Sequence, residues 1–172
     1  MIREPHEEHY TALGKLTANW AALEAQLASA IWQIGEIPDQ IGASLTAQVW
    51  GLDGRLKALQ SILRIRDFED IAKELNVFWD KKLRALQEFR NRRIHDPVHF
   101  PGAGVVARLE VTANKKLKFG YEPEAFEEMV EKIDAIADAI DEFAKIIQPA
   151  LEACPPLPHT SLERRGKAPP RP

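Results

Sequence analysis

Residues 68–97 read FEDIAKELNVFWDKKLRALQEFRNRRIHDP and combine a helical core pattern with a dense group of basic side chains. Their apolar residues recur at steps of three and four, which places them on one face of an α-helix. Pro97 disfavours helical geometry at Asp96, so the sequence predicts one helix from about Phe68 or Asp70 to His95. The residues predicted to face the core are Ile71, Leu75, Phe78, Leu83, Leu86, Phe89 and Ile94.

Three further helices are predicted by the same periodicity. One apolar stripe runs from Tyr10 to Ile34, and a second runs from Leu45 to Ile62. A last stripe runs from Phe126 to Leu151, with Pro123 placed where a first helical residue would stand. Four amphipathic helices joined by short connections indicate a mainly α protein, a four-helix bundle.

A small β insertion is predicted before the last helix, because the apolar pattern there changes to strict alternation. Residues 105–111 alternate between apolar and polar positions, which is typical of a strand with one buried face. Ala113 to Lys116 would form the turn, and Leu117 to Tyr121 the returning strand. The sequence thus predicts a β-hairpin at about residues 104–121, and since a lone hairpin is marginal, we expect it to lie on the helices.

Residues 155–172 differ from the rest of the chain in composition. They contain six of its twelve prolines and only two large apolar side chains, Leu157 and Leu162. Such a segment can neither continue a helix nor bury a face. We therefore expect one helical domain in residues 1–154, followed by a proline-rich disordered tail.

Composition and charge exclude several classes of protein. With 172 residues, of which 45% are hydrophobic, the chain can build one core and is not natively disordered. The net charge of −3 gives no general attraction to nucleic acid, so any such binding must be local. No apolar run could cross a bilayer, and the single cysteine, Cys154, can form no internal disulfide. These features favour a cytoplasmic protein with no metal, no cofactor and no membrane partner.

The local exception to this acidity is residues 81–93, with six basic side chains against one acid, Glu88. Arginine presents a planar fork of donors that matches two phosphate oxygens, so this concentration suits phosphate binding. The alternative is a solvated helix end whose cations meet the negative end of the helix dipole. The candidate phosphate-binding or RNA-binding residues are Lys81, Lys82, Arg84, Arg92 and Arg93.

Three residues at the end of this run carry the candidate chemistry: Arg90, Asn91 and His95. Helical spacing puts Asn91 and His95, four residues apart, on one face. Arg90 is five residues from His95 and lies off that face. Joint action of Arg90 and His95 therefore requires a distorted last turn or a second subunit.

The hexapeptide Arg90-Asn91-Arg92-Arg93-Ile94-His95 resembles the motif of the HEPN superfamily, in which an arginine, a polar residue, a short spacer and a histidine end the third long helix of a bundle. The resemblance covers roughly residues 8–153 through helix order and motif placement. It implies a metal-independent endoribonuclease that works as a homodimer, with two motifs facing each other across the subunit interface. Pro97 stands where many toxin members carry an aromatic residue. The resemblance also implies a toxin–antitoxin or defence system, in which a protein partner holds the enzyme in check.

The residue types account for such chemistry without a metal, because RNA supplies its own nucleophile, the 2′-hydroxyl. Histidine can both accept and donate a proton near neutral pH, which is the role expected of His95. Arg90 would stabilise the phosphorane charge and Asn91 would orient His95 or a phosphate oxygen. The expected products carry 2′,3′-cyclic phosphate and 5′-hydroxyl ends. The alternative is a non-catalytic HEPN-like module that binds RNA, a nucleotide or an acidic protein.

Overall fold

Helices form most of the chain in this computed structural model, which describes residues 5–49, 51–96, 98–102, 105–109, 121–123 and 126–154. The helices are α1 (Pro5–Ile34), α2 (Asp39–Gln48), α3 (Gly51–Ile65), α4 (Glu69–Phe78), the π-helix η1 (Trp79–Leu83), α5 (Arg84–His95) and α6 (Phe126–Ala153). The strands are β1 (Val98–Gly102), β2 (Val105–Leu109) and β3 (Tyr121–Pro123). The predicted tail, residues 155–172, lies outside the described residues.

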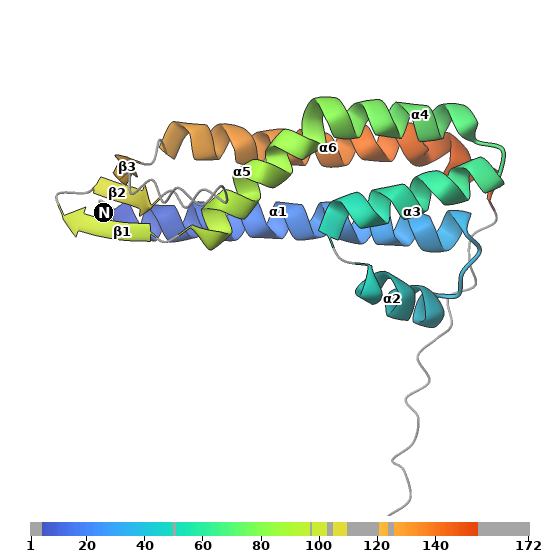
Figure 1. The fold of residues 1–172 in the computed structure, drawn as a ribbon, viewed down its shortest axis with the longest axis horizontal. Coiled ribbons are helices and arrows are strands. Elements are labelled where there is room, and N and C mark those ends of the chain that lie inside the picture. The colour runs from blue at the N-terminus through green and yellow to red at the C-terminus, as the bar shows by residue number, and fades with distance from the viewer. Residues whose placement is uncertain are drawn as a thin grey trace, which may run out of the picture.

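The long helices form a bundle, which confirms the predicted helical architecture. α1 packs against both α3 and α6, and α4 packs against α3 and α6, so the four close a ring around one core (Figure 1). α1 and α6 run in the same direction. Two hydrogen bonds show this: Asn19 donates to the Ile133 carbonyl and, further along both helices, Gln33 donates to the Leu151 carbonyl, each at 3.3 Å. The largest fully buried side chains include Leu16, Trp20, Leu23, Leu27, Leu59, Leu75 and Phe143.

The second predicted helix, Leu45 to Ile62, is wrong as a single element. The chain leaves helical geometry after Gln48, and Gly51 then takes a φ of +74°, a conformation that favours glycine. α2 lies instead across Trp32, whose Nε1 donates to Thr46 Oγ1 at 3.3 Å. Gly42 permits this approach, since a Cβ there would lie 2.5 Å from the Trp32 ring.

The third predicted helix has the expected extent, but it is not uniform. The chain stays helical from Glu69 to His95, with the π-helix η1 between α4 and α5. Consecutive aromatic residues Phe78 and Trp79 are both buried there, which an ideal α-helix with a single inward stripe does not readily allow. In Figure 1, α5 slopes away from α4 and crosses toward α1. The candidate motif is thereby brought against α1.

A three-stranded antiparallel sheet, in the order β1-β2-β3, connects α5 to α6. β2 falls within the predicted strand and pairs with β3, Ala107 opposite Pro123. The predicted turn at 113–116 and most of the returning strand lie outside the described residues, so the hairpin as drawn from the sequence stays a prediction. β1 was not predicted; its residue His99 lies opposite Ala107 in β2.

No helix in the described part of the chain is long and apolar enough to cross a membrane.

Candidate active site at the end of α5

Arg90 lies against α1 and is half-buried. Its Cζ atom is 6.0 Å from the centroid of the Trp20 ring, and its Nη1 donates to Asn91 Oδ1 at 3.0 Å. A guanidinium over an indole is attracted by the negative face of the ring. The Arg90 Nε–H is buried and has no acceptor among the described residues. The indole and the Asn91 amide together fix the direction of this guanidinium.

Four of the six basic side chains in residues 81–93 are paired with carboxylates. The pairs are Lys82–Glu142 at 2.6 Å, Arg84–Asp80 at 2.9 Å, Arg92–Glu88 at 3.2 Å and Arg93–Glu128 at 3.2 Å. Arg90 and Lys81 have no carboxylate partner within the described ranges. Most of the local positive charge that the sequence indicates is therefore neutralised, and Arg90 is the exception nearest His95.

Arg93, one of the predicted phosphate ligands, is part of the packed interior of the single chain. It is 6% exposed, its Cζ lies 4.3 Å from the Phe89 ring centroid, and its Nη2 donates to Glu128 on α6. This burial leaves Arg93 little surface for a phosphate. Its position fastens α5 to α6.

His95 is the last residue of α5, and its side chain is exposed. It makes no hydrogen bond to any residue that the structure describes. Asn91 stands one turn earlier, and Asp96, the residue after the helix, has an extended backbone with a ψ of 132°. Arg90 contacts α1 while His95 faces outward, so one chain does not direct the two side chains at a common point.

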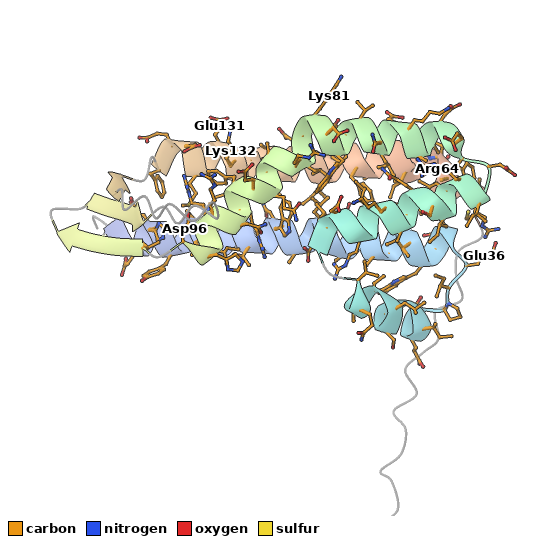
Figure 2. The ribbon with its side chains drawn as sticks, in the orientation of Figure 1. Glu36, Arg64, Lys81, Asp96, Glu131 and Lys132 are labelled. Atoms are coloured by element: carbon orange, nitrogen blue, oxygen red, sulfur yellow. The ribbon has the colours of Figure 1, made fainter. Side chains whose placement is uncertain are left out.

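Lys81 and Lys82 lie on η1, about two turns before Arg90. They line a shallow cavity of about 450 Å³ that α4 and η1 form with α6. The other lining residues are Glu74, Val77, Phe78, Glu142 and Ile146. Figure 2 shows Lys81 projecting away from the bundle, remote from Asp96 at the far end of α5. Since two glutamates share this cavity with the two lysines, its charge does not select anions.

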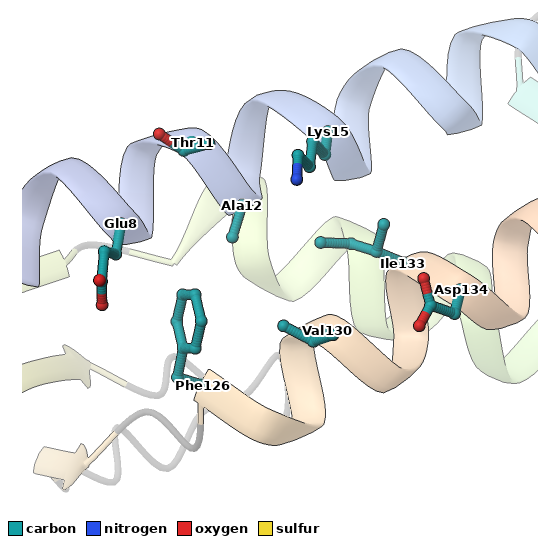
Figure 3. A pocket seen from close by; sticks show the side chains of 8 residues that line it. All are labelled: Glu8, Thr11, Ala12, Lys15, Phe126, Val130, Ile133 and Asp134. Carbon is teal, nitrogen blue, oxygen red and sulfur yellow. The ribbon is translucent and has the colours of Figure 1, made fainter.

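A second groove, of about 320 Å³, lies between the first halves of α1 and α6. Phe126, Val130 and Ile133 face Ala12 across it, with Glu8, Thr11, Lys15 and Asp134 around them (Figure 3). None of the candidate residues from 81–95 lines this groove. It is a separate feature from the Arg90–His95 region.

Comparison with protein-family models, curated proteins and solved structures finds no match to this chain. In the described part of the chain, no group of three or more His, Cys, Asp or Glu residues could hold a metal ion.

Sequence reasoning missed the groups that surround the motif. Glu128 and Glu142 are 35 and 60 residues away from their basic partners, so no local pattern could indicate these pairs. Trp20 lies within the apolar stripe predicted from Tyr10 to Ile34, and it is 2% exposed. Its second role, as the surface on which Arg90 lies, follows only from the crossing of α5 over α1.

Proposed function

We propose that this protein is a metal-independent endoribonuclease of HEPN type, with Arg90, Asn91 and His95 in its active site. One observation carries the proposal: an arginine without a carboxylate partner, fixed by Trp20 and Asn91, lies within one and a half turns of an exposed histidine. The motif lies at the end of the continuous helical stretch that α4, η1 and α5 form, the third long one of the bundle. This placement supports the HEPN-like fold.

The proposed reaction is attack of an RNA 2′-hydroxyl on the adjacent phosphorus. In the proposed dimer, His95 of one protomer takes the proton from the 2′-oxygen and His95 of its partner gives one to the departing 5′-oxygen. Arg90 donates to the phosphorane oxygens, where negative charge accumulates in the transition state. Asn91 holds Arg90 through its Oδ1, so its first role is to orient the arginine. The bond to the 5′-oxygen breaks, which gives a 2′,3′-cyclic phosphate and a 5′-hydroxyl.

A homodimer that meets through α5, the end of the third predicted helix, completes the proposed site. The exposed positions of α5 are Arg84, Ala85, Glu88, Arg92 and His95, which follow the three- and four-residue spacing of one helix face. This face carries two arginines and one glutamate, so Glu88 of each copy can pair with an arginine of the other, and the remaining positive charge suits an RNA phosphate. Arg90 of one protomer can then act with His95 of its partner.

RNA contacts in this proposal begin with Arg90 and Lys81, since the other cations of residues 81–93 already have carboxylate partners. Lys82, Arg84 and Arg92 reach phosphate only in exchange for Glu142, Asp80 and Glu88. A protein partner of antitoxin type and a cytoplasmic setting belong to the same proposal. The protein partner rests on the family resemblance of residues 90–95, and the cytoplasmic setting rests on the single cysteine and the lack of a long apolar run in the sequence.

Cleavage of assorted RNAs by the purified protein in EDTA tests the proposal. Arg90→Ala should lower the rate by about 10²-fold or more, as loss of a charge-stabilising donor does. Arg64→Ala is the matched control, because Arg64 is a half-exposed arginine on α3 that pairs with Glu69 at 3.5 Å. Single-stranded DNA should survive, because it has no 2′-hydroxyl. Equal rates for the two variants would contradict the assigned role of Arg90.

A second candidate, a non-catalytic module that binds RNA, a nucleotide or an acidic protein, is favoured by one observation. Four of the six basic side chains already pair with carboxylates, which leaves few cations to hold an RNA in position for cleavage. If the wild-type protein binds RNA but leaves every substrate intact, this candidate replaces the enzyme.

A further inference from the structure

A chain of contacts connects Arg90 to α3 through α1. Trp20 Nε1 donates to Glu24 Oε1 at 3.0 Å, one turn along α1. The other oxygen of the same carboxylate, Oε2, accepts from Arg55 Nη1 on α3 at 3.4 Å. Arg90 lies over the ring of the same Trp20. Three helices therefore contribute to one polar network, which is largely shielded from solvent: the side chains of Arg55 and Glu24 are only 20% and 29% exposed.

This network places a carboxylate beside the one indole that Arg90 also contacts. A free Glu24 carboxylate at that position would be drawn to the Arg90 guanidinium, as the carboxylates of Asp80, Glu88, Glu128 and Glu142 are to their own basic partners. Glu24 instead accepts one hydrogen bond from the Trp20 indole and one from Arg55, which hold its carboxylate between α1 and α3, and it forms no ion pair with Arg90. Arg90 consequently keeps a positive charge that no described carboxylate cancels.

We propose that Arg55 is a positioning residue that holds Glu24 away from Arg90 and so preserves the anion-binding charge of Arg90. Trp20 contacts both charged groups: its ring lies under the Arg90 guanidinium, and its N–H donates to one oxygen of Glu24. The inference rests on the proposed function only for its effect on RNA cleavage. The state of the Arg90 guanidinium can be measured without any activity.

A double-mutant cycle on Arg55 and Glu24 tests this role. Arg55→Ala frees Glu24 to pair with Arg90, and we expect RNA cleavage in EDTA to slow by about tenfold, less than full loss of a charge-stabilising donor. Glu24→Gln in the Arg55→Ala background removes the competing carboxylate, so the rate should return to within about threefold of wild type. A residue with a merely structural role would give no such rescue, because the second substitution removes a further contact.

The second readout is the Arg90 Nε–H resonance in ¹H–¹⁵N spectra, assigned by its loss in Arg90→Lys. It should move in Arg55→Ala and return toward its wild-type position in the double variant. Arg64→Ala, on the same helix, should leave it in place. If Arg55→Ala does not fold, the same cycle is run with Arg55→Gln, which keeps part of the apolar stem.

The two readouts separate the possible failures. An inert wild-type protein would end the proposed function, and the spectra would still decide the role of Arg55. An unmoved Arg90 resonance in the Arg55 variant, or a double variant no better than the single one, would overturn the positioning role even if the wild-type enzyme cleaves RNA.

Discussion

Arg92 and Arg93 are neighbours in the chain but have different surroundings. Arg93 is buried against Phe89 and bound to Glu128, whereas Arg92 is exposed and pairs with Glu88 on its own helix. We expect Arg93→Ala to lower the free energy of unfolding by about 1–3 kcal/mol, because a packed, charge-assisted contact is lost. Arg92→Ala should change it by less than about 0.5 kcal/mol, as exposed pairs do.

Urea denaturation of the two variants checks this difference. Equal losses of stability would show that Arg93 does not join α5 to α6 as its burial indicates. If Arg93→Ala is as stable as wild type but loses RNA binding, the residue is a phosphate ligand and not a packing residue.

Within the helices, replacing two glycines by alanine should change the stability of the protein in opposite directions. Gly42 in α2 approaches Trp32, and an added Cβ would lie 2.5 Å from its ring, whereas a Cβ at Gly14 in α1 would meet no atom within 4 Å. Gly42→Ala should destabilise the protein by about 1–3 kcal/mol through overpacking. Gly14→Ala should stabilise it by about 0.5–1 kcal/mol, since alanine loses less backbone entropy in a helix.

Thermal unfolding of both alanine variants provides the measurement. A stabilised Gly42→Ala variant would mean that α2 does not pack on Trp32 as described. A destabilised Gly14→Ala variant would mean that this face of α1 is covered.

The elements that sequence periodicity predicts well are those whose stripe is uninterrupted. α1 ends at Ile34 and α5 at His95, where Gly35 and Pro97 indicate the ends. The break between α2 and α3 was missed because Leu45, Val49 and Leu52 continue the helical spacing across it. Periodicity carries no information about the positive φ of Gly51.

The strand β1 was missed for a different physical reason. It contains Pro101, which cannot donate a hydrogen bond and argues against a strand. The structure places β1 at the edge of the sheet, with an irregular register between His99 and Gly102. An edge and a bulge are the positions where a sheet tolerates proline, but neither is visible before the sheet is assembled.

At the scale of the whole molecule, the sequence indicated the position of the candidate site but not its electrostatics. The relation of Arg90, Asn91 and His95 follows from helical spacing alone. The charge along the third predicted helix depends on Glu128 and Glu142 from α6, which pair with Arg93 on α5 and Lys82 on η1, and on Glu24 from α1, which binds Trp20; only the folded bundle brings these groups together. The positive charge counted over residues 81–93 of the sequence is therefore larger than the unpaired positive charge that these residues present to a ligand.

The proposed homodimer gives a prediction about association. Ala85 lies on the exposed face of α5, and Ala137 lies on an exposed position of α6. Ala85→Arg should shift sedimentation from dimer to monomer, since it adds bulk and charge beside the two-fold axis. Ala137→Arg, the matched control, should remain dimeric. A wild-type protein that stays monomeric at high concentration would contradict the paired-site arrangement.

Product analysis of wild type and His95→Ala in EDTA tests directly whether the end of α5 cleaves RNA without a metal. We expect 2′,3′-cyclic phosphate ends from the wild-type protein and a rate roughly a hundred- to ten-thousandfold lower from His95→Ala, which loses the proton-transfer group while the helix remains folded. If neither protein produces cyclic phosphate ends from any RNA, or if both produce them at the same rate, the claim is contradicted.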